Sequence, residues 1–246
     1  MAEENEMVTR YKTIKIYGVP VESVKETIND LLDSKSPAIK LEQHDAETHI
    51  ILSAAADTEE DALALIKPVS KEIKHRFGNS IYSTKENESI EMAVVRLLGK
   101  YELTVSTAES CTGGLLAGRL VNVPGVSEVF KEGFVTYSNK AKRKTLDVSK
   151  STLKKYGAVS KQTAKEMATG AVFAADTDAS VSVTGIAGPD GGTDKKPVGL
   201  VFIGCYLKDK VTVEEYHFEG DRTQIREQAV NSALNLLRRI ILENYK

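Results

Sequence analysis

The chain has 246 residues, 41% hydrophobic and 28% charged, which is typical of a globular protein with enough apolar material for one large or two ordinary domains. No apolar run approaches the roughly 20 residues that span a bilayer, and the acidic segment 1–6 lacks the basic and apolar regions of a signal peptide. We therefore expect a cytoplasmic protein without a membrane partner. Two cysteines, Cys111 and Cys205, are too few for a disulfide scaffold or a thiolate zinc site.

The charges are unevenly distributed along the chain. Residues 1–88 contain 11 Lys and Arg against 17 Asp and Glu, a balance of −6, and the remainder contains 22 against 18, a balance of +4. The second part is therefore the better host for an anionic ligand, and the first part is a poor electrostatic partner for nucleic acid.

The first 86 residues predict a polar, disordered lead over 1–10 and a small domain over 11–86. The elements expected in order are strand 11–17, helix 21–32, strands 39–44 and 49–54 joined as a hairpin, helix 57–77 with a kink at Pro68, and strand 81–83. This β-α-β-β-α-β order predicts an α+β domain with its helices on one side of a sheet, and it resembles a KH-type module. No G-x-x-G loop, which clamps a nucleic-acid backbone in such modules, occurs before residue 89, so we expect a spacer or oligomerisation role rather than RNA binding.

Residues 87–246 predict a second domain in which strands and helices alternate. The expected elements are a helix from about residue 90, strand 103–107, helix 115–121, strand 132–137, a short basic helix from 140, a longer helix from Ser160, strand 179–183, a hairpin of 198–207 and 211–218, and a last helix. Asp221 and Gln224 form a capping box for that last helix. The pattern favours a three-layer α/β/α fold.

The segment 108–114, Ala-Glu-Ser-Cys-Thr-Gly-Gly, lies where a strand becomes a helix. The first N–H groups of a helix are unpaired, and glycines there let an anion or a developing oxyanion approach. Ser110 could therefore be a nucleophile beside an oxyanion site. The alternative is that Ser110 or Thr112 only caps the helix, and Cys111 is better interpreted as a small packed residue than as the nucleophile.

Three further segments carry candidate binding groups. The basic run 140–144 follows a strand, as the Ser110 turn does, so both could open on one sheet edge, although such a run is most often a solvated face. The segment 184–192 contains four glycines and fits a loop around a ligand or a generic flexible loop. Of Arg222 and Arg226, one could bind a phosphate through its guanidinium fork, and a surface role is equally compatible with the sequence.

Six ordered motifs resemble the C-terminal domain of the CinA family, the nicotinamide-nucleotide amidohydrolases. They are Ala108 to Gly114, Val135-Thr136-Tyr137-Ser138-Asn139 with Lys142, Gly157 to Ser160, Thr184 to Gly191, Lys196 to Gly199, and Gly220-Asp221-Arg222. Residues 11–83 resemble the middle, KH-like domain of the same family. The resemblance therefore covers nearly the whole chain.

The resemblance implies hydrolysis of the carboxamide of nicotinamide mononucleotide to nicotinate mononucleotide and ammonia, in pyridine nucleotide salvage. Only His217 lies in this domain, so a Ser–His–Asp triad is poorly supplied. We expect Ser110 as the nucleophile, Lys142 as the general base and Tyr137 as a relay or orienting group. A lysine serves as a base when neighbouring cations, here Lys140, Arg143 and Lys144, or partial desolvation lower its pKa.

Substrate contacts are assigned to the same motifs. Amides of Thr112, Gly113 and Gly114 would stabilise the oxyanion, the loop of Gly185, Ala187 and Gly188 would hold the base or ribose, and Arg222 would bind the phosphate.

No cofactor or metal is expected. We expect a homodimer, because homodimers are the commonest oligomers of soluble proteins.

The sequence departs from full-length family members, which carry an N-terminal domain that resembles molybdopterin-binding proteins and is linked to nucleotide pyrophosphatase activity. That domain is absent from the sequence, so we expect no such activity and no metal dependence. The alternative to an amidohydrolase is a non-catalytic nucleotide-binding or competence-related interaction protein that uses the same cleft.

Overall fold

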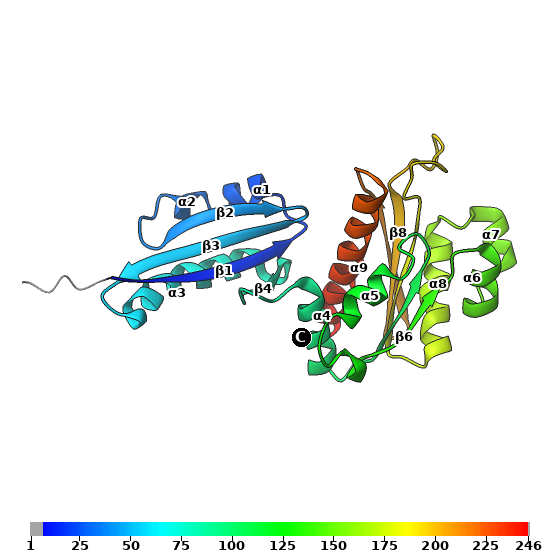
Figure 1. Ribbon diagram of the computed structural model, residues 1–246, viewed down its shortest axis with the longest axis horizontal. Coiled ribbons are helices and arrows are strands. Elements are labelled where there is room, and N and C mark those ends of the chain that lie inside the picture. The colour runs from blue at the N-terminus through cyan, green and yellow to red at the C-terminus, as the bar shows by residue number, and fades with distance from the viewer. Residues whose placement is uncertain (1–6, 246) are drawn as a thin grey trace, which may run out of the picture. The chain divides into compact units, whose positions relative to one another are not determined.

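The computed structural model describes residues 7–245, and the chain divides into two compact units, residues 1–89 and 90–246 (Figure 1). Residues 1–6, which include most of the predicted disordered lead, lie outside the described residues. The rest of that predicted lead differs from the expectation, because the first strand already begins at Val8.

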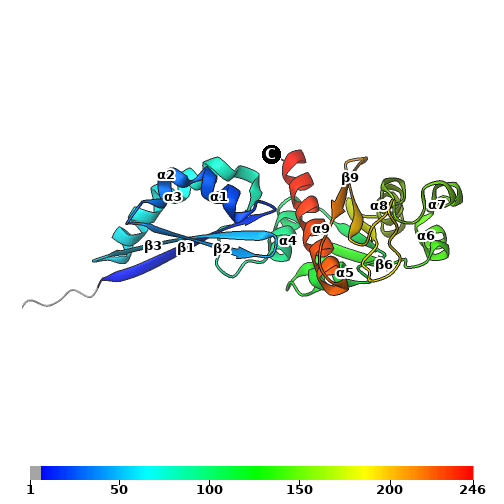
Figure 2. The same cartoon turned by 90° about the horizontal axis from the view of Figure 1, so that it is seen from above.

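The first unit is a four-stranded antiparallel sheet with helices on one face (Figure 2). Its strand order is β2-β3-β1-β4. Its elements are β1 (Val8–Tyr17), α1 (Val21–Thr27), α2 (Asn29–Leu32), β2 (Ala38–His44), β3 (Glu47–Ala56), α3 (Glu59–Phe77), the 3-10 helix η1 (Gly78–Ser80) and β4 (Ile81–Ser83). The β-α-β-β-α-β order and the KH-like class predicted from the sequence are confirmed.

Alternation along the strands builds the core of this unit. Ile14 and Ile16 of β1 pair with Ile50 and Thr48 of β3, so their side chains share the face that the helices cover. Ile66 and Ile73 of α3 pack on that face and are almost fully buried. The helix continues through Pro68.

The second unit contains a five-stranded mixed sheet of order β6-β5-β7-β8-β9. Its elements are α4 (Ile90–Lys100), β5 (Val105–Glu109), α5 (Leu115–Val121), η2 (Val126–Glu128), β6 (Phe130–Val135), α6 (Asn139–Leu146), α7 (Lys150–Tyr156), α8 (Lys161–Ala175), β7 (Ala179–Gly185), β8 (Leu200–Leu207), β9 (Lys210–His217) and α9 (Arg222–Asn244). Strand β5 is parallel to β6 and β7, whereas β7, β8 and β9 pair antiparallel.

Helices cover both faces of this sheet, which confirms the three-layer α/β/α class. Helices α4, α5 and α9 lie on one side, and α6, α7 and α8 lie on the other (Figure 1). Small residues on α8 allow close packing, as predicted, since Ala164, Ala168 and Ala171 are fully buried. The capping box of Asp221 and Gln224 at the start of α9 is also present.

Helix α7 was not predicted, because its sequence Lys-Ser-Thr-Leu-Lys-Lys-Tyr has almost no apolar stripe. Its position depends on a distant carboxylate. Glu166 of α8 accepts hydrogen bonds from the Ser149 N–H (2.8 Å) and the Thr152 hydroxyl (2.5 Å), which ties the first turn of α7 to α8. Among the helices in residues 7–245, none is long and apolar enough to cross a membrane.

Candidate active site

Three sequence motifs meet at one edge of the sheet of the second unit. Strands β5, β6 and β7 are parallel, so their carboxyl ends lie at the same edge. The first residue after β5 is Ser110, after β6 Thr136 and after β7 Ile186. The prediction that the Ser110 turn and the basic helix open on one edge is therefore confirmed by the sheet.

The turn from β5 into α5 is held by the last residue of the strand. Gly113 and Gly114 have φ values of +61° and +97°, a region that favours glycine, so the chain can reverse sharply here. Glu109 is 1% exposed, and its carboxylate accepts hydrogen bonds from the N–H groups of Gly114 (3.0 Å), Leu116 (3.1 Å) and Ala117 (2.9 Å). The Glu109 carboxylate therefore already occupies the N-terminal end of α5, where unpaired N–H groups favour a negative charge.

Lys142 reaches Ser110 from the second turn of α6. The Ser138 hydroxyl caps this helix by accepting from the Ala141 N–H (3.0 Å). The Lys142 side chain is fully buried, and its Nζ donates to Ser110 Oγ (2.9 Å) and to the Thr136 carbonyl (2.7 Å). Ser110 is 8% exposed, so Ser110 and Lys142 lie beneath the surface at this edge of the sheet.

Burial lowers the pKa of Lys142 from 10.5 to about 8, because an ammonium group loses its hydration in the interior. The sequence had suggested neighbouring cations as one cause, but Lys140, Arg143 and Lys144 are exposed and do not contribute to the shift. Desolvation, the other cause considered, accounts for the direction. With this pKa, about half of the amine is neutral at pH 8 and about a tenth at pH 7.

The three expected oxyanion donors differ in availability. The Gly113 N–H donates to the Ser110 carbonyl (3.2 Å) and the Gly114 N–H donates to Glu109 (3.0 Å), so both are engaged. The Thr112 N–H donates to no oxygen within residues 7–245, and the sulfur of Cys111 is the polar atom beside it, since this amide lowers the pKa of that thiol. Among these three amides, that of Thr112 is the one left to bind an oxyanion.

Two buried hydroxyls beside the pair also lack a partner. Thr112 and Thr136 are at most 1% exposed, and neither Oγ1 atom has a hydrogen-bond partner among the described residues. Buried polar atoms are nearly always satisfied in native proteins. Hydroxyls without a partner next to Ser110 and Lys142 favour a place where a polar ligand or water binds.

Tyr137 and Arg222 form the rim of this edge. The Tyr137 ring is 64% exposed, and its hydroxyl accepts from Arg222 Nη2 (3.3 Å), while Arg222 Nη1 donates to the Gly188 carbonyl (2.6 Å). Tyr137 makes no hydrogen bond to Ser110 or Lys142 in the part of the chain described. It therefore connects the segment after β6 with the glycine-rich loop and the start of α9.

The glycine-rich loop lies close to the backbone of Leu200 and to the side chain of Val198. A Cβ atom on Gly185 would lie 2.8 Å from the Leu200 carbonyl oxygen, and one on Gly188, whose φ is +78°, would lie 2.7 Å from Val198. Ala187 is 4% exposed. Packing against β8 and the segment before it is therefore a sufficient reason for these small residues, and their substrate contacts stay a prediction.

Two important residues were not assigned by sequence reasoning. Glu109 was part of the quoted motif without a role, and Arg226 was considered for a phosphate contact or a surface role. Arg226 Nε donates to the Cys111 carbonyl (3.0 Å) and its Nη2 to the Thr112 carbonyl (2.8 Å). The only sequence signal was the position of Arg226 one helical turn after Arg222, which does not reveal contacts to a turn more than 110 residues away.

Other groups in this unit are less suited to the chemistry. His217 is exposed and bonds Glu215 (2.9 Å) on β9, and burial raises the pKa of the Cys111 thiol to about 11. Within residues 7–245, no three His, Cys, Asp or Glu residues form a group that could hold a metal ion.

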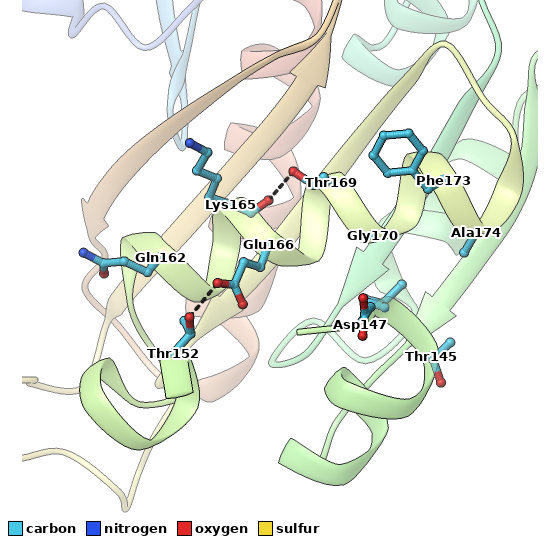
Figure 3. A pocket seen from close by; sticks show the side chains of 11 residues that line it. Thr145, Asp147, Thr152, Gln162, Lys165, Glu166, Thr169, Gly170, Phe173 and Ala174 are labelled. Carbon is cyan, nitrogen blue, oxygen red and sulfur yellow. Dashed lines mark hydrogen bonds between the residues drawn. The ribbon is translucent and has the colours of Figure 1, made fainter. Parts of the chain in front are cut away.

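A separate hollow of about 800 Å³ lies between α6, α7 and α8 (Figure 3). It is lined by, among others, Asp147, Lys165, Glu166 and Phe173. Ser110 and Lys142 do not line it. Because the Glu166 carboxylate already accepts two hydrogen bonds from the α7 region, this hollow offers no comparable pair of nucleophile and base.

Comparison with protein families identifies the fold's relatives. Residues 87–241 match the family described as the CinA C-terminal domain, which is more than half of the chain. The chain belongs to the CinA family. Residues 11–83 match the family described as the damage-inducible protein CinA KH domain.

Similar proteins agree with this assignment. The chain is 48% identical over 244 residues to a "Putative competence-damage inducible protein" of Clostridium beijerinckii and 47% identical over 232 residues to a "CinA-like protein" of Kosmotoga olearia. These alignments cover 99% and 94% of this chain but 59% and 56% of the relatives, so the chain spans little more than half of their length.

Solved structures of family members match part of this CinA-family chain. A competence/damage inducible protein from Agrobacterium tumefaciens is 45% identical, with a TM-score of 0.59, over 60% of this chain and 91% of that one. A CinA superfamily protein from Klebsiella pneumoniae is 34% identical, with a TM-score of 0.61, over 63% of this chain and 96% of that one.

Proposed function

We propose that this chain hydrolyses the carboxamide of nicotinamide mononucleotide, giving nicotinate mononucleotide and ammonia in pyridine nucleotide salvage. The observation that carries the proposal is the 2.9 Å contact between the buried Lys142 amine and the Ser110 hydroxyl. Amide hydrolysis needs a nucleophile, a base and an oxyanion site. A lysine with a pKa near 8 supplies the base in a domain whose one histidine, His217, is exposed and bonds Glu215.

The Thr136 carbonyl orients the amine for this role. A carbonyl oxygen only accepts, so Lys142 must direct one N–H toward Thr136 at 2.7 Å. The lone pair of the neutral amine can then face Ser110 and accept the hydroxyl proton. We assign Lys142 as the general base and Ser110 as the nucleophile.

The reaction then proceeds in two balanced halves. Ser110 Oγ bonds to the carboxamide carbon as its proton passes to Lys142, and the carbonyl electron pair moves to oxygen. When that pair returns, the C–N bond breaks and the Lys142 ammonium gives its proton to the leaving nitrogen, which departs as ammonia. Water attacks the resulting ester with Lys142 again taking a proton, and collapse returns a proton to Ser110 and releases the acid.

The remaining assignments follow the rim of the site. The Thr112 N–H is the proposed oxyanion donor, Tyr137 and Arg222 are proposed to hold the substrate phosphate and ribose, and the loop of Gly185, Ala187 and Gly188 borders the base. We further propose a homodimer without a nucleic-acid partner. No metal or cofactor enters any of these steps.

Ser110→Ala is the decisive variant. It should abolish ammonia release from nicotinamide mononucleotide while nucleotide binding stays measurable by calorimetry, because the nucleophile is lost and the rim is intact. The assay uses a panel of pyridine nucleotides with EDTA present, and Ser127→Ala, an exposed serine of η2, is the matched control.

Two results would contradict the proposal. Turnover retained by Ser110→Ala would remove this serine from the mechanism. Binding without ammonia release by the unaltered protein would instead support the alternative of a non-catalytic nucleotide-binding protein.

A further inference from the structure

The turn that carries Ser110 is held from a second side by α9. Arg226 contacts two successive carbonyl groups of this turn, Cys111 O at 3.0 Å through Nε and Thr112 O at 2.8 Å through Nη2. The side chain is only partly exposed. Because the guanidinium is a rigid planar fork, two simultaneous contacts fix the orientation of both peptide groups.

These contacts determine where the Thr112 N–H points. Apart from Ser36-Pro37 and Gly188-Pro189, the peptide bonds of the described chain are trans, so the Cys111–Thr112 peptide directs its N–H opposite to its C=O. Arg226 holds that C=O toward α9. The Thr112 N–H therefore faces away from α9, and it donates to no oxygen within residues 7–245.

The neighbouring amides do not have this freedom. The Gly113 N–H is taken by the Ser110 carbonyl and the Gly114 N–H by Glu109. A cation on a peptide oxygen also polarises the peptide and makes its N–H a stronger donor. Arg226 thus contacts the carbonyl groups of two peptides, and of these only the Cys111–Thr112 peptide has an N–H that donates to no oxygen within residues 7–245.

We propose that Arg226 is a positioning residue for the hydrolysis, which orients and polarises the Cys111–Thr112 peptide so that the Thr112 N–H stabilises the oxyanion. This inference rests on the proposed amidohydrolase function. It separates Arg226 from Arg222, one helical turn earlier, which bonds Tyr137 and Gly188 at the rim. Arg226 acts through the backbone and does not contact the substrate.

The test compares Arg226→Gln and Arg226→Lys with Arg239→Gln. Arg239 is also on α9 but bonds Glu214 of β9, so it controls for the loss of an arginine from the same helix. Arg226→Gln should lower kcat by about 100-fold, the usual effect of losing one oxyanion donor, with the Kd for nicotinamide mononucleotide changed less than threefold. Arg226→Lys, which can reach one carbonyl, should recover part of kcat.

A second measurement reports on the oxyanion directly. The aldehyde analogue of the substrate, nicotinaldehyde mononucleotide, adds the Ser110 hydroxyl to give a tetrahedral hemiacetal whose oxygen occupies the oxyanion position. Its affinity should fall in Arg226→Gln by the same factor as kcat, whereas Arg239→Gln should leave it unchanged. Thermal unfolding of each variant checks that it is folded, and Arg226→Lys decides the question if Arg226→Gln does not fold.

The possible failures are distinguishable. A raised KM with unchanged kcat would mean that Arg226 binds substrate and would overturn the positioning role while leaving the serine mechanism intact. Aldehyde affinity that is unchanged in the folded variants would overturn it as well. Absence of ammonia release from the unaltered protein would overturn the proposed function and this inference together.

Discussion

Lys142 differs from the other basic residues of its helix through burial alone. Lys140, Arg143 and Lys144 are exposed, whereas the Lys142 side chain is fully enclosed and its amine contacts Ser110 and Thr136. Transfer of an ammonium group out of water disfavours its charged form. Of the four basic residues between 140 and 144, three are therefore solvated and only Lys142 is a candidate base.

The pH dependence of activity follows from this burial. Lys142 acts as a base only when neutral, so kcat/KM should rise about tenfold per pH unit below its pKa and level off above about pH 8. Initial rates of ammonia release between pH 6 and 9.5 test this, with circular dichroism at each pH to show that the protein stays folded. A profile without an ionisation between pH 7 and 9 would remove Lys142 as the base.

Arg222 provides a test of the substrate rim. Arg222→Ala should raise KM for nicotinamide mononucleotide by about 10-fold or more, since a charge-assisted contact contributes roughly 1.5–3 kcal/mol. Binding of free nicotinamide, which has no phosphate, should change little. Equal losses for both ligands in steady-state kinetics would show that Arg222 acts through the structure of the loop and not through a phosphate.

At the scale of elements, the site depends on how closely α6 approaches α8. A Cβ atom on Gly170 of α8 would lie 2.0 Å from the Leu146 carbonyl oxygen, at the end of the helix that carries Lys142. Backbone cannot yield as a flexible side chain does. Gly170 therefore allows α6 to pack closely against α8, and this packing determines how deeply the Lys142 side chain is buried.

Gly170→Ala should consequently destabilise the fold and move α6. We expect a loss of about 1–3 kcal/mol, as for overpacking in a core, and a lower kcat because Lys142 is displaced from Ser110. Chemical denaturation and kinetics measure the two effects. Gly118→Ala in α5 is the matched control, because nothing lies within 4 Å of its Cβ, and it should be neutral or stabilising by up to about 1 kcal/mol. Equal behaviour of the two variants would contradict the packing argument.

At the scale of the whole molecule, each unit has its own sheet and its own core. Core residues such as Ile14 and Ile50 belong to the first unit, and those of β5, β7 and β8 belong to the second. The solved family members cover 60–66% of this chain, close to the share made up by residues 90–246, and 91–97% of their own length in four cases. Chains of about the length of this unit are therefore folded in the solved structures of relatives.

Residues 90–246 alone should therefore fold and hydrolyse nicotinamide mononucleotide with kcat/KM within about threefold of the full chain, since all proposed site residues lie in this unit. Expression of this fragment, a single cooperative unfolding transition and an ammonia assay test the expectation. An inactive but folded fragment would assign a part of the site to the first unit.

The sequence by itself determined most of the elements and the positions of the motifs. Period-2 and period-3.6 patterns are local, so the KH-like order, helix 115–121, the strand of 179–183 and the capping box of Asp221 could be predicted from neighbouring residues. Parallel strand ends also bring Ser110 and Lys142 to one edge once the alternation of strands and helices is recognised. Helix α7 was missed because its stability comes from Glu166 and not from a pattern of its own.

Only the tertiary structure decided the electrostatics and the donors of the site. Desolvation of Lys142 depends on everything packed around it. The Gly114 N–H is engaged by Glu109, and the Cys111 carbonyl is engaged by Arg226, which is 115 residues from Cys111 in the chain. Burial and long-range hydrogen bonds are properties of the assembled fold, because neither leaves a periodic signal in the sequence. The residue types of a serine and lysine pair could be identified from motifs, but which amine is neutral and which amide is free depended on packing.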